Sequence, residues 1–191
     1  MMKILRFLTI TQFACAAILA AGTIPGQDTA LRVDAAQTRV EFTLPDLLHT
    51  VHGTFQLKRG DLRFDPASGK ASGELVVDAA SGDSGSAGRD RRMHANILQS
   101  DRYPEITFRP DRVIGKVVPD GKFAVELHGM FGIHGTEHEI TLPMEVEAAG
   151  GQYTATGTFK VPYVKWGMKN PSTLFLRVSD TVEITIHTVA R

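Results

Sequence analysis

Apolar and polar residues alternate along most of the chain, and this period of two is the main signal of its secondary structure. The run Val40-Glu41-Phe42-Thr43-Leu44 is the clearest example. Alternation of this kind predicts β-strands that bury one face and expose the other. The pattern recurs at 55–58, 61–64, 73–78, 106–108, 123–127, 140–146, 153–161, 175–178 and 182–186.

Segments of turn-forming residues separate these runs. They include Asp65-Pro66-Ala67-Ser68-Gly69, Pro119-Asp120-Gly121 and Ala148-Ala149-Gly150-Gly151, whose Pro, Asp and Gly residues favour tight turns. Many short strands at short spacing indicate a sandwich or a barrel. An even set of about eight strands, joined mostly by hairpins, predicts an all-β fold, namely an eight-stranded antiparallel up-and-down barrel.

One stretch departs from the alternation. Residues 81–86 are rich in Gly, Ser and Asp, which predicts a loop. The next segment, 90–98, carries apolar residues at helical spacing, namely Met93, Ile97 and Leu98. Tyr103-Pro104 should end this helix, because the residue before proline resists the α conformation. We therefore expect one short helix over an end of the barrel.

Residues 1–22 have the composition of a secretory signal peptide. Lys3 and Arg6 precede an apolar run at 10–21, and small residues follow it. The run is shorter than the ~20 residues of a spanning helix, which argues against the alternative, an uncleaved N-terminal anchor. Cys15, the only cysteine, lies in this leader. We expect a cysteine-free barrel domain, 23–191, that is periplasmic or secreted and not membrane-spanning.

Charge adds little to this picture. The chain has 21 Lys and Arg against 21 Asp and Glu, for a formal net charge of zero. A nucleic-acid-binding domain should carry a basic stripe, and the sequence has none, so nucleic acid is not an expected partner. The adjacent residues Arg89 and Asp90 are interpreted as a catalytic ion pair or as a structural pair at the start of the helix.

Histidine is the residue type that could carry chemistry. A metal site needs several ligands that converge on one point, and the candidates are His49, His52, His94, His134 and His138. His49 and His52 would point to opposite faces of a regular strand, and the segment 135–137 between His134 and His138 is expected to be a turn. Structural histidines at the barrel rim and a metal site both remain open.

The apolar face of the strands is the candidate binding surface. A barrel of this size is either filled by its own side chains or holds one small ligand, and periodicity does not decide between these. The tract 163–171 adds Trp166 and Met168 beside cations, a mixture that suits a pocket mouth. The other candidate ligand-binding residues are Phe42, Leu44, Phe55, Leu57, Phe64, Leu75, Val77, Phe108, Leu127, Phe131, Ile133, Leu142, Met144 and Phe159.

Several segments, in this order and spacing, resemble one known family. They are Leu48-His49-Thr50-Val51-His52-Gly53-Thr54-Phe55, Asp61-Leu62-Arg63-Phe64-Asp65-Pro66, Ser81-Gly82-Asp83-Ser84-Gly85 followed by Arg89-Asp90, Tyr103-Pro104-Glu105-Ile106-Thr107-Phe108, Gly129-Met130-Phe131-Gly132-Ile133-His134-Gly135 and Ser179-Asp180-Thr181-Val182-Glu183-Ile184. From about Leu31 to Val189, the chain is similar to YceI-like, lipocalin-like periplasmic proteins.

This resemblance implies an extended eight-stranded barrel with a helix over one end. It also implies that the interior binds a long isoprenoid lipid, such as a polyprenyl or isoprenoid-quinone tail, and that the protein forms a homodimer. It brings no catalytic residues and no cofactor. The sequence departs from the family pattern after Arg89-Asp90 and at 166–172, where the barrel mouth is expected.

The leading functional hypothesis is therefore a non-enzymatic binder that stores or transports an isoprenoid-type lipid. The alternative is a metal-binding protein or a metal-dependent enzyme that uses the rim histidines. A filled barrel that acts only through a protein partner is the third hypothesis.

Overall fold

The computed structural model describes residues 28–45, 50–173 and 177–191, and eight of its strands close into an antiparallel barrel. Each strand pairs with the next along the chain, and β9 pairs with β2 to close the barrel. The predicted up-and-down barrel is thus confirmed. The strands are β2 (Arg39–Pro45), β3 (Thr50–Phe64), β4 (Ala71–Asp83), β5 (Glu105–Ile114), β6 (Gly121–Ile133), β7 (Thr136–Ala149), β8 (Gln152–Val161) and β9 (Val182–Ala190).

A ninth strand, β1 (Thr29–Arg32), lies beside the end of β3, where Thr29 pairs with Phe64. Its far side meets the chain terminus, because Arg32 and Arg191 exchange backbone hydrogen bonds of 2.6 and 3.0 Å. The alternation analysis did not identify this strand, since it has only four residues and one buried side chain, Leu31. β1 therefore completes the wall beyond the start of β2.

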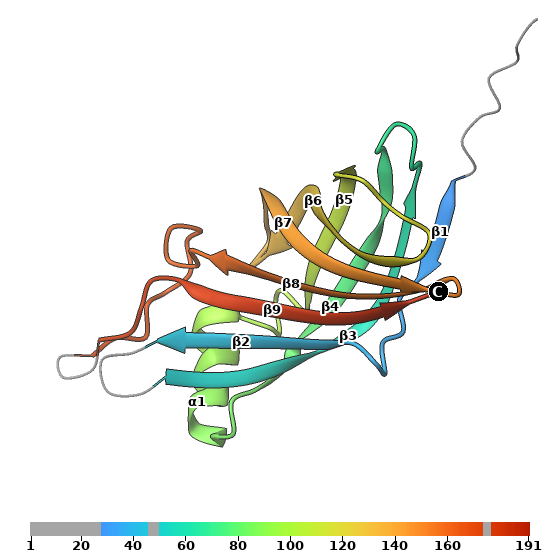
Figure 1. Cartoon of the computed structure of the whole chain (residues 1–191). Helices are drawn as coiled ribbons and strands as arrows, with labels where there is room; N and C mark the ends of the chain where they lie inside the picture. Colours follow the sequence, from blue (N-terminus) through green and yellow to red (C-terminus); the bar gives the residue numbers. More distant parts are fainter. Residues whose placement is uncertain (1–27, 46–49, 174–176) are drawn as a thin grey trace, which may run out of the picture.

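The two ends of the barrel differ in their connections (Figure 1). One end carries the short helix α1 (Ala87–Arg92), the π-helical turn η1 (Met93–Leu98) and the long segment 162–181. We call this the helix end. The opposite end has tight turns at 65–69 and 150–151, and it also holds β1 and the C-terminus. Only the helix end has connections long enough to shape a binding site.

The predicted short helix is present, but its limits differ from the expectation. It begins at Ala87, three residues earlier than predicted, and it ends at Leu98, before Tyr103-Pro104 is reached. Gln99 stops it, because this residue adopts a left-handed conformation with φ 48° and ψ 53°. A left-handed end at a residue other than glycine leaves no compositional signal in the sequence.

Three other local predictions are corrected. The runs 55–58 and 61–64 belong to a single strand, β3, which has a bulge between Leu57 and Arg59. Residues 81–83 continue β4, because Ser81 Oγ accepts a hydrogen bond from Gln56 N at 2.8 Å and ties the segment to β3. Of the predicted strand 175–178, the described residues Arg177 and Val178 lie outside the nine strands.

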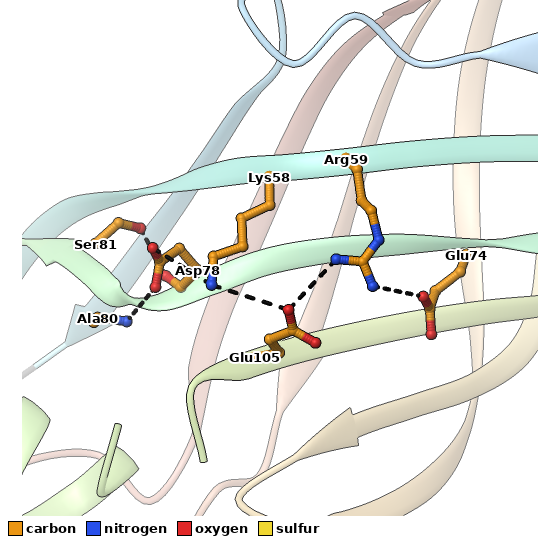
Figure 2. Close-up of polar contacts among 7 residues, drawn as sticks. All are labelled: Lys58, Arg59, Glu74, Asp78, Ala80, Ser81 and Glu105. Carbon is orange, nitrogen blue, oxygen red and sulfur yellow. Dashed lines mark hydrogen bonds and ion pairs between the residues drawn. The ribbon is translucent and has the colours of Figure 1, made fainter. Parts of the chain in front are cut away.

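Charged side chains link the outer faces of β3, β4 and β5 (Figure 2). Arg59 Nη2 lies 3.1 Å from Glu74 Oε2, and its Nη1 lies 3.4 Å from Glu105 Oε1. Lys58 extends the chain of charges to Asp78 at 3.7 Å and to Glu105 at 4.0 Å. Exposed pairs of this kind stabilise little individually. They show that this face of the sheet points to solvent, so the alternate side chains face the barrel interior.

A cavity inside the barrel as the candidate functional site

The inward-facing side chains do not fill the barrel. They surround a main cavity of about 550 Å³, in the half of the barrel nearer the helix end. Aromatic pairs form part of its wall, with ring centroids 5.4 Å apart for Phe42 and Phe55 and 5.6 Å apart for Phe131 and Phe159. The volume lies within the range of ~300–1,000 Å³ typical of small-molecule sites. The sequence did not decide between a filled core and a cavity, and the structure shows an apolar cavity.

The mouth of the main cavity is polar and is built by the start of the helix. Ser84, Ser86, Arg89 and Arg92 line it. Arg89 and Asp90 both bind Ser84, which replaces the simple ion pair expected from their adjacency. Arg89 Nε donates to Ser84 Oγ at 2.7 Å, and Ser84 N donates to an Asp90 carboxylate oxygen at 3.0 Å. The hydrogen bonds from Ser84 hold the pKa of Asp90 below its ordinary value.

Described residues of 162–173 and 177–181 form the other side of the mouth, where Tyr163 and Met168 are buried against the cavity. The Tyr163 hydroxyl donates to the Ser179 carbonyl at 2.7 Å. Burial, with a smaller effect of the nearby Asp180 carboxylate, raises the pKa of Tyr163 to about 12. Asn170 Nδ2 donates to Val178 O at 3.1 Å, which closes the segment on itself. The polar groups of this tract thus fix the backbone around the mouth.

A second cavity of about 100 Å³ lies toward the tight-turn end. Its wall is apolar and includes Val125, Val146 and Tyr153. Four side chains line both cavities and lie between them, namely Leu75, Phe108, Leu142 and Ile186. We call these four residues the floor of the main cavity.

The structure brings most of the predicted binding residues to one of these cavities. Those that line the main cavity are Phe42, Leu44, Phe55, Leu75, Val77, Phe108, Phe131, Ile133, Leu142, Phe159 and Met168. Phe64, Leu127 and Met144 line only the second cavity.

Two predicted residues, Leu57 and Trp166, line neither cavity. Leu57 is buried next to the β3 bulge, which shifts the following residues in register. Trp166 lies outside the cavity wall, where it packs on Phe131 with ring centroids 5.9 Å apart. Strand alternation had placed Leu57 in the site, and the composition of the tract 163–171 had placed Trp166 there.

Sequence reasoning missed part of the wall. Most of the missed strand residues lie within the predicted runs and follow their alternation, so applying the period of two along each whole run would have found them. Others, on the helix and in the segment 162–181, needed the fold. The missed residues include Val40, Val51, Met93, Ile97, Leu98, Ile106, Ile140, Val161, Tyr163, Val178, Val182, Ile184 and Ile186.

The candidate metal-binding histidines do not converge in the described structure. His52 is exposed on β3, where its Nδ1 lies 3.1 Å from Thr43 Oγ1. His94 Nε2 donates to the Gly82 carbonyl at 2.9 Å. Within residues 28–45, 50–173 and 177–191, no group of three or more His, Cys, Asp or Glu side chains could hold a metal ion. His49 falls outside those ranges, and the metal hypothesis gains no support.

His134 and His138 flank the β6–β7 turn and face different neighbours. The turn consists of His134 and Gly135, with φ values of 53° and 77°, so Thr136 and Glu137 already belong to β7. The His134 ring packs on Tyr103 at 4.7 Å between centroids. The His138 ring stacks on Trp166, with ring centroids 3.9 Å apart and an angle of 6° between the ring planes. Both histidines are therefore packing residues of the helix end.

The predicted leader, 1–22, lies outside the described residues. Among the residues that the structure does describe, no helix has the length and apolar character needed to cross a membrane.

The fold and the cavity together define the class: a closed antiparallel barrel, covered at one end by a short helix, with an apolar interior site. The family model described as a YceI-like domain matches residues 31–190. The chain therefore belongs to the YceI-like family, as its sequence motifs predicted. A comparison with curated proteins found no match.

Solved structures share this fold at low sequence identity. Burkholderia cenocepacia BcnA aligns with a TM-score of 0.69 and 22% identity, over 83% of this chain and 99% of that one. A polyisoprenoid binding domain from Saccharophagus degradans, implicated in plant cell wall breakdown, aligns with a TM-score of 0.63 and 15% identity, over 84% of this chain and 97% of that one. The Campylobacter jejuni YceI protein aligns with a TM-score of 0.60 and 20% identity, over 74% of this chain and 85% of that one.

Proposed function

We propose that the main cavity binds the apolar tail of an isoprenoid-type lipid, and that the protein stores or transports this lipid without catalysis. The observation that carries the proposal is the cavity of about 550 Å³ with an almost wholly hydrocarbon wall. Burial of each CH₂ group of a tail contributes ~0.8 kcal/mol. A linear chain can therefore bind firmly in such a site without polar contacts along its length.

The mouth supports a ligand with a polar head. Ser84, Ser86, Arg89 and Arg92 line the cavity at the start of the helix, whereas the rest of its wall is mostly apolar. A lipid whose tail enters first would leave its head group beside these polar residues. Family membership and the neighbour described as a polyisoprenoid binding domain support the same ligand class. With a signal peptide at 1–22, the protein would act in the periplasm or outside the cell.

Mass spectrometry of organic extracts tests this proposal. The full chain is purified without detergent from its expression host, and co-purifying lipid is identified by its mass. We expect a prenyl lipid at a substantial fraction of one molecule per barrel. In Phe108→Asp, a carboxylate in the apolar interior should abolish loading, since an unpaired buried charge is unfavourable.

Thr158→Asp is the matched control, because Thr158 is exposed on β8 beside the wall residue Phe159. It should load as the wild type does. Circular dichroism and thermal unfolding verify that both variants fold. Protein that stays empty even after incubation with prenyl alcohols would contradict the proposal.

A further inference from the structure

The floor divides the apolar interior into two compartments of unequal size. Leu75 and Phe108 are paired neighbours on β4 and β5, and they contribute two of its four side chains. Leu142 on β7 and Ile186 on β9 contribute the other two. Phe108, Leu142 and Ile186 are buried, with at most 9% of their surface exposed. Beyond it the second cavity continues the same hydrocarbon wall toward the tight-turn end.

Glycines occupy inward positions at the level of the floor. On β8, Gly157 lies between Phe159, which lines the main cavity, and Ala155, which lines the second. A Cβ atom at Gly157 would meet Met144 Sδ first, and then the Pro143 carbonyl oxygen at 2.8 Å and Leu142 Cδ1 at 3.2 Å. The missing side chain therefore leaves room for two inward side chains of β7, Met144 and the floor residue Leu142.

Glycines also lie at this level on β6 and β3. Gly129 lies between Phe131, in the main cavity, and Leu127, in the second, and an added Cβ there would meet the β5 backbone at Arg109 and Pro110. Gly60 pairs directly with Leu75, and an added Cβ would lie 3.0 Å from Val33 Cβ and 3.4 Å from Leu75 Cγ. Strands therefore approach closely at the level of the floor, where these glycines carry no side chain.

We propose that the floor is the specificity-determining element that limits the length of the bound prenyl chain. This inference rests on the proposed function, since it concerns the tail of the same ligand. A tail that enters at the helix end stops at Phe108 and Leu142, and further isoprene units remain at the mouth. Removal of a floor side chain joins the two cavities and admits a longer tail.

The main cavity offers a matched control for the loss of a phenylalanine. Phe108 and Phe131 pair with each other across β5 and β6, and each is 7% exposed. Both line the main cavity, but only Phe108 also lines the second. Replacement of either by alanine removes the same atoms from the wall. Only Phe108→Ala opens a path through the floor.

The experiment measures the affinity of delipidated full-length protein for farnesol, geranylgeraniol and longer linear prenyl alcohols by native mass spectrometry. In the wild type, affinity should rise with chain length and then level off. In Phe108→Ala, the plateau should move to longer chains, with a gain of at least about tenfold for the first isoprene unit beyond the wild-type limit. Phe131→Ala should keep the wild-type limit.

A second pair of variants keeps the test decisive. Leu142→Ala removes a different floor side chain and should extend the limit even where Phe108→Ala does not fold. Ala155→Phe fills the second cavity alone, so it should cancel the gain when combined with either floor variant.

The proposed role of the floor would be wrong if the chain-length limit were unchanged in both floor variants, or if it shifted equally in Phe108→Ala and Phe131→Ala. Either result would leave the proposed lipid-binding function standing. A wild-type affinity that rises without a plateau would also overturn it. Failure of every alcohol to bind the wild type would overturn both proposals.

Discussion

At the scale of single residues, the stack of Trp166 on His138 packs the segment that follows β8 against the start of β7. His138 has the inward parity of β7, and its Nε2 is buried without a hydrogen-bond partner in the structure. The indole lies parallel to it at 3.9 Å and also contacts Phe131 of the cavity wall. Because burial disfavours the charged imidazolium, the pKa of His138 is lowered from its ordinary value of 6.5.

This stack predicts a pH-dependent fluorescence signal, because Trp166 is the only tryptophan and an imidazolium quenches an adjacent indole. Neutral His138 is favoured in the folded state, so its contribution to stability is present above pH 6.5 and is lost as pH falls through the lower folded pKa. Emission should be constant above pH 6.5 and fall in the acid range below it.

His138→Gln should remove this transition, whereas His52→Gln, on the outer face of β3, should retain it. A midpoint at or above pH 6.5, or a transition that persists in His138→Gln, would contradict the assignment. The readout is steady-state fluorescence of the folded protein, with circular dichroism at each pH to show that the barrel remains intact.

At the scale of elements, glycine within strands has a packing role that alternation patterns do not display. Gly157 carries no side chain, yet it occupies an inward position of β8 that is completely surrounded. A strand pattern marks such a position as a weak point, since glycine lowers strand propensity. In the barrel it provides space for the neighbouring side chains of β7, and these neighbours are the reason that glycine is needed at this position.

Gly157→Ala should therefore destabilise the protein by about 1–3 kcal/mol, because the added methyl group overpacks the interior against the Pro143 carbonyl. Urea unfolding followed by circular dichroism measures the change as a lower midpoint at unchanged m-value.

Gly88→Ala is the control for this substitution. Gly88 lies in α1, and the nearest atom to an added Cβ is Arg91 Nη2 at 3.9 Å. Alanine there should be neutral or slightly stabilising, by up to ~1 kcal/mol, since alanine favours helix. A Gly157→Ala protein as stable as the wild type would show that β7 relaxes freely and that this glycine is not needed for packing.

The sequence predicted the elements well where alternation was undisturbed. Strands such as Gln152–Val161 could be identified from a period of two, and so could the inward face that lines the cavity. It failed where tertiary contacts decide: β1, the bulge at Leu57, and the extension of β4 through Ser81. In each case, pairing with a distant strand fixes a backbone that has no local preference.

At the scale of the whole molecule, charge and hydrocarbon are separated by the barrel wall. The network around Arg59 and Glu105 lies outside, and the two cavities lie inside. The sequence could predict that the inner face is apolar but not that it encloses free volume. Whether side chains fill a barrel depends on how far each one reaches across it, and the floor shows that one layer can be closed while the next is open.

A charged cluster on the outer face of the barrel should make the stability of the protein depend on pH above 6.5. His128, on the outer face of β6, lies between two carboxylates, with Nδ1 2.6 Å from Asp111 Oδ1 and Nε2 2.9 Å from Glu139 Oε1. Hydrogen bonds to Asp111 and then to Glu139 raise the pKa of His128 above its ordinary value of 6.5. The charged imidazolium therefore links three strands, β5, β6 and β7, on the surface of the barrel.

Because the pKa of His128 is raised in the folded state, the stability of the protein should decrease with rising pH. The contribution of His128 is fully present below pH 6.5 and is lost as pH rises through the folded pKa. The melting temperature of the wild type should therefore fall as pH rises above 6.5, and His128→Gln should flatten this fall while leaving unfolding at higher pH nearly unchanged. Asp111→Asn should lower the pKa of His128 measured by NMR, because it removes the carboxylate whose hydrogen bond raises that pKa most. His187→Gln is the matched control. His187 is exposed, its Nδ1 is hydrogen-bonded to Thr156 Oγ1 at 3.0 Å, and its replacement should keep the wild-type dependence of melting temperature on pH. An equal flattening in both variants would assign the pH dependence to histidine content in general, whereas a change confined to His128→Gln would locate it in the carboxylate pair that holds three strands together.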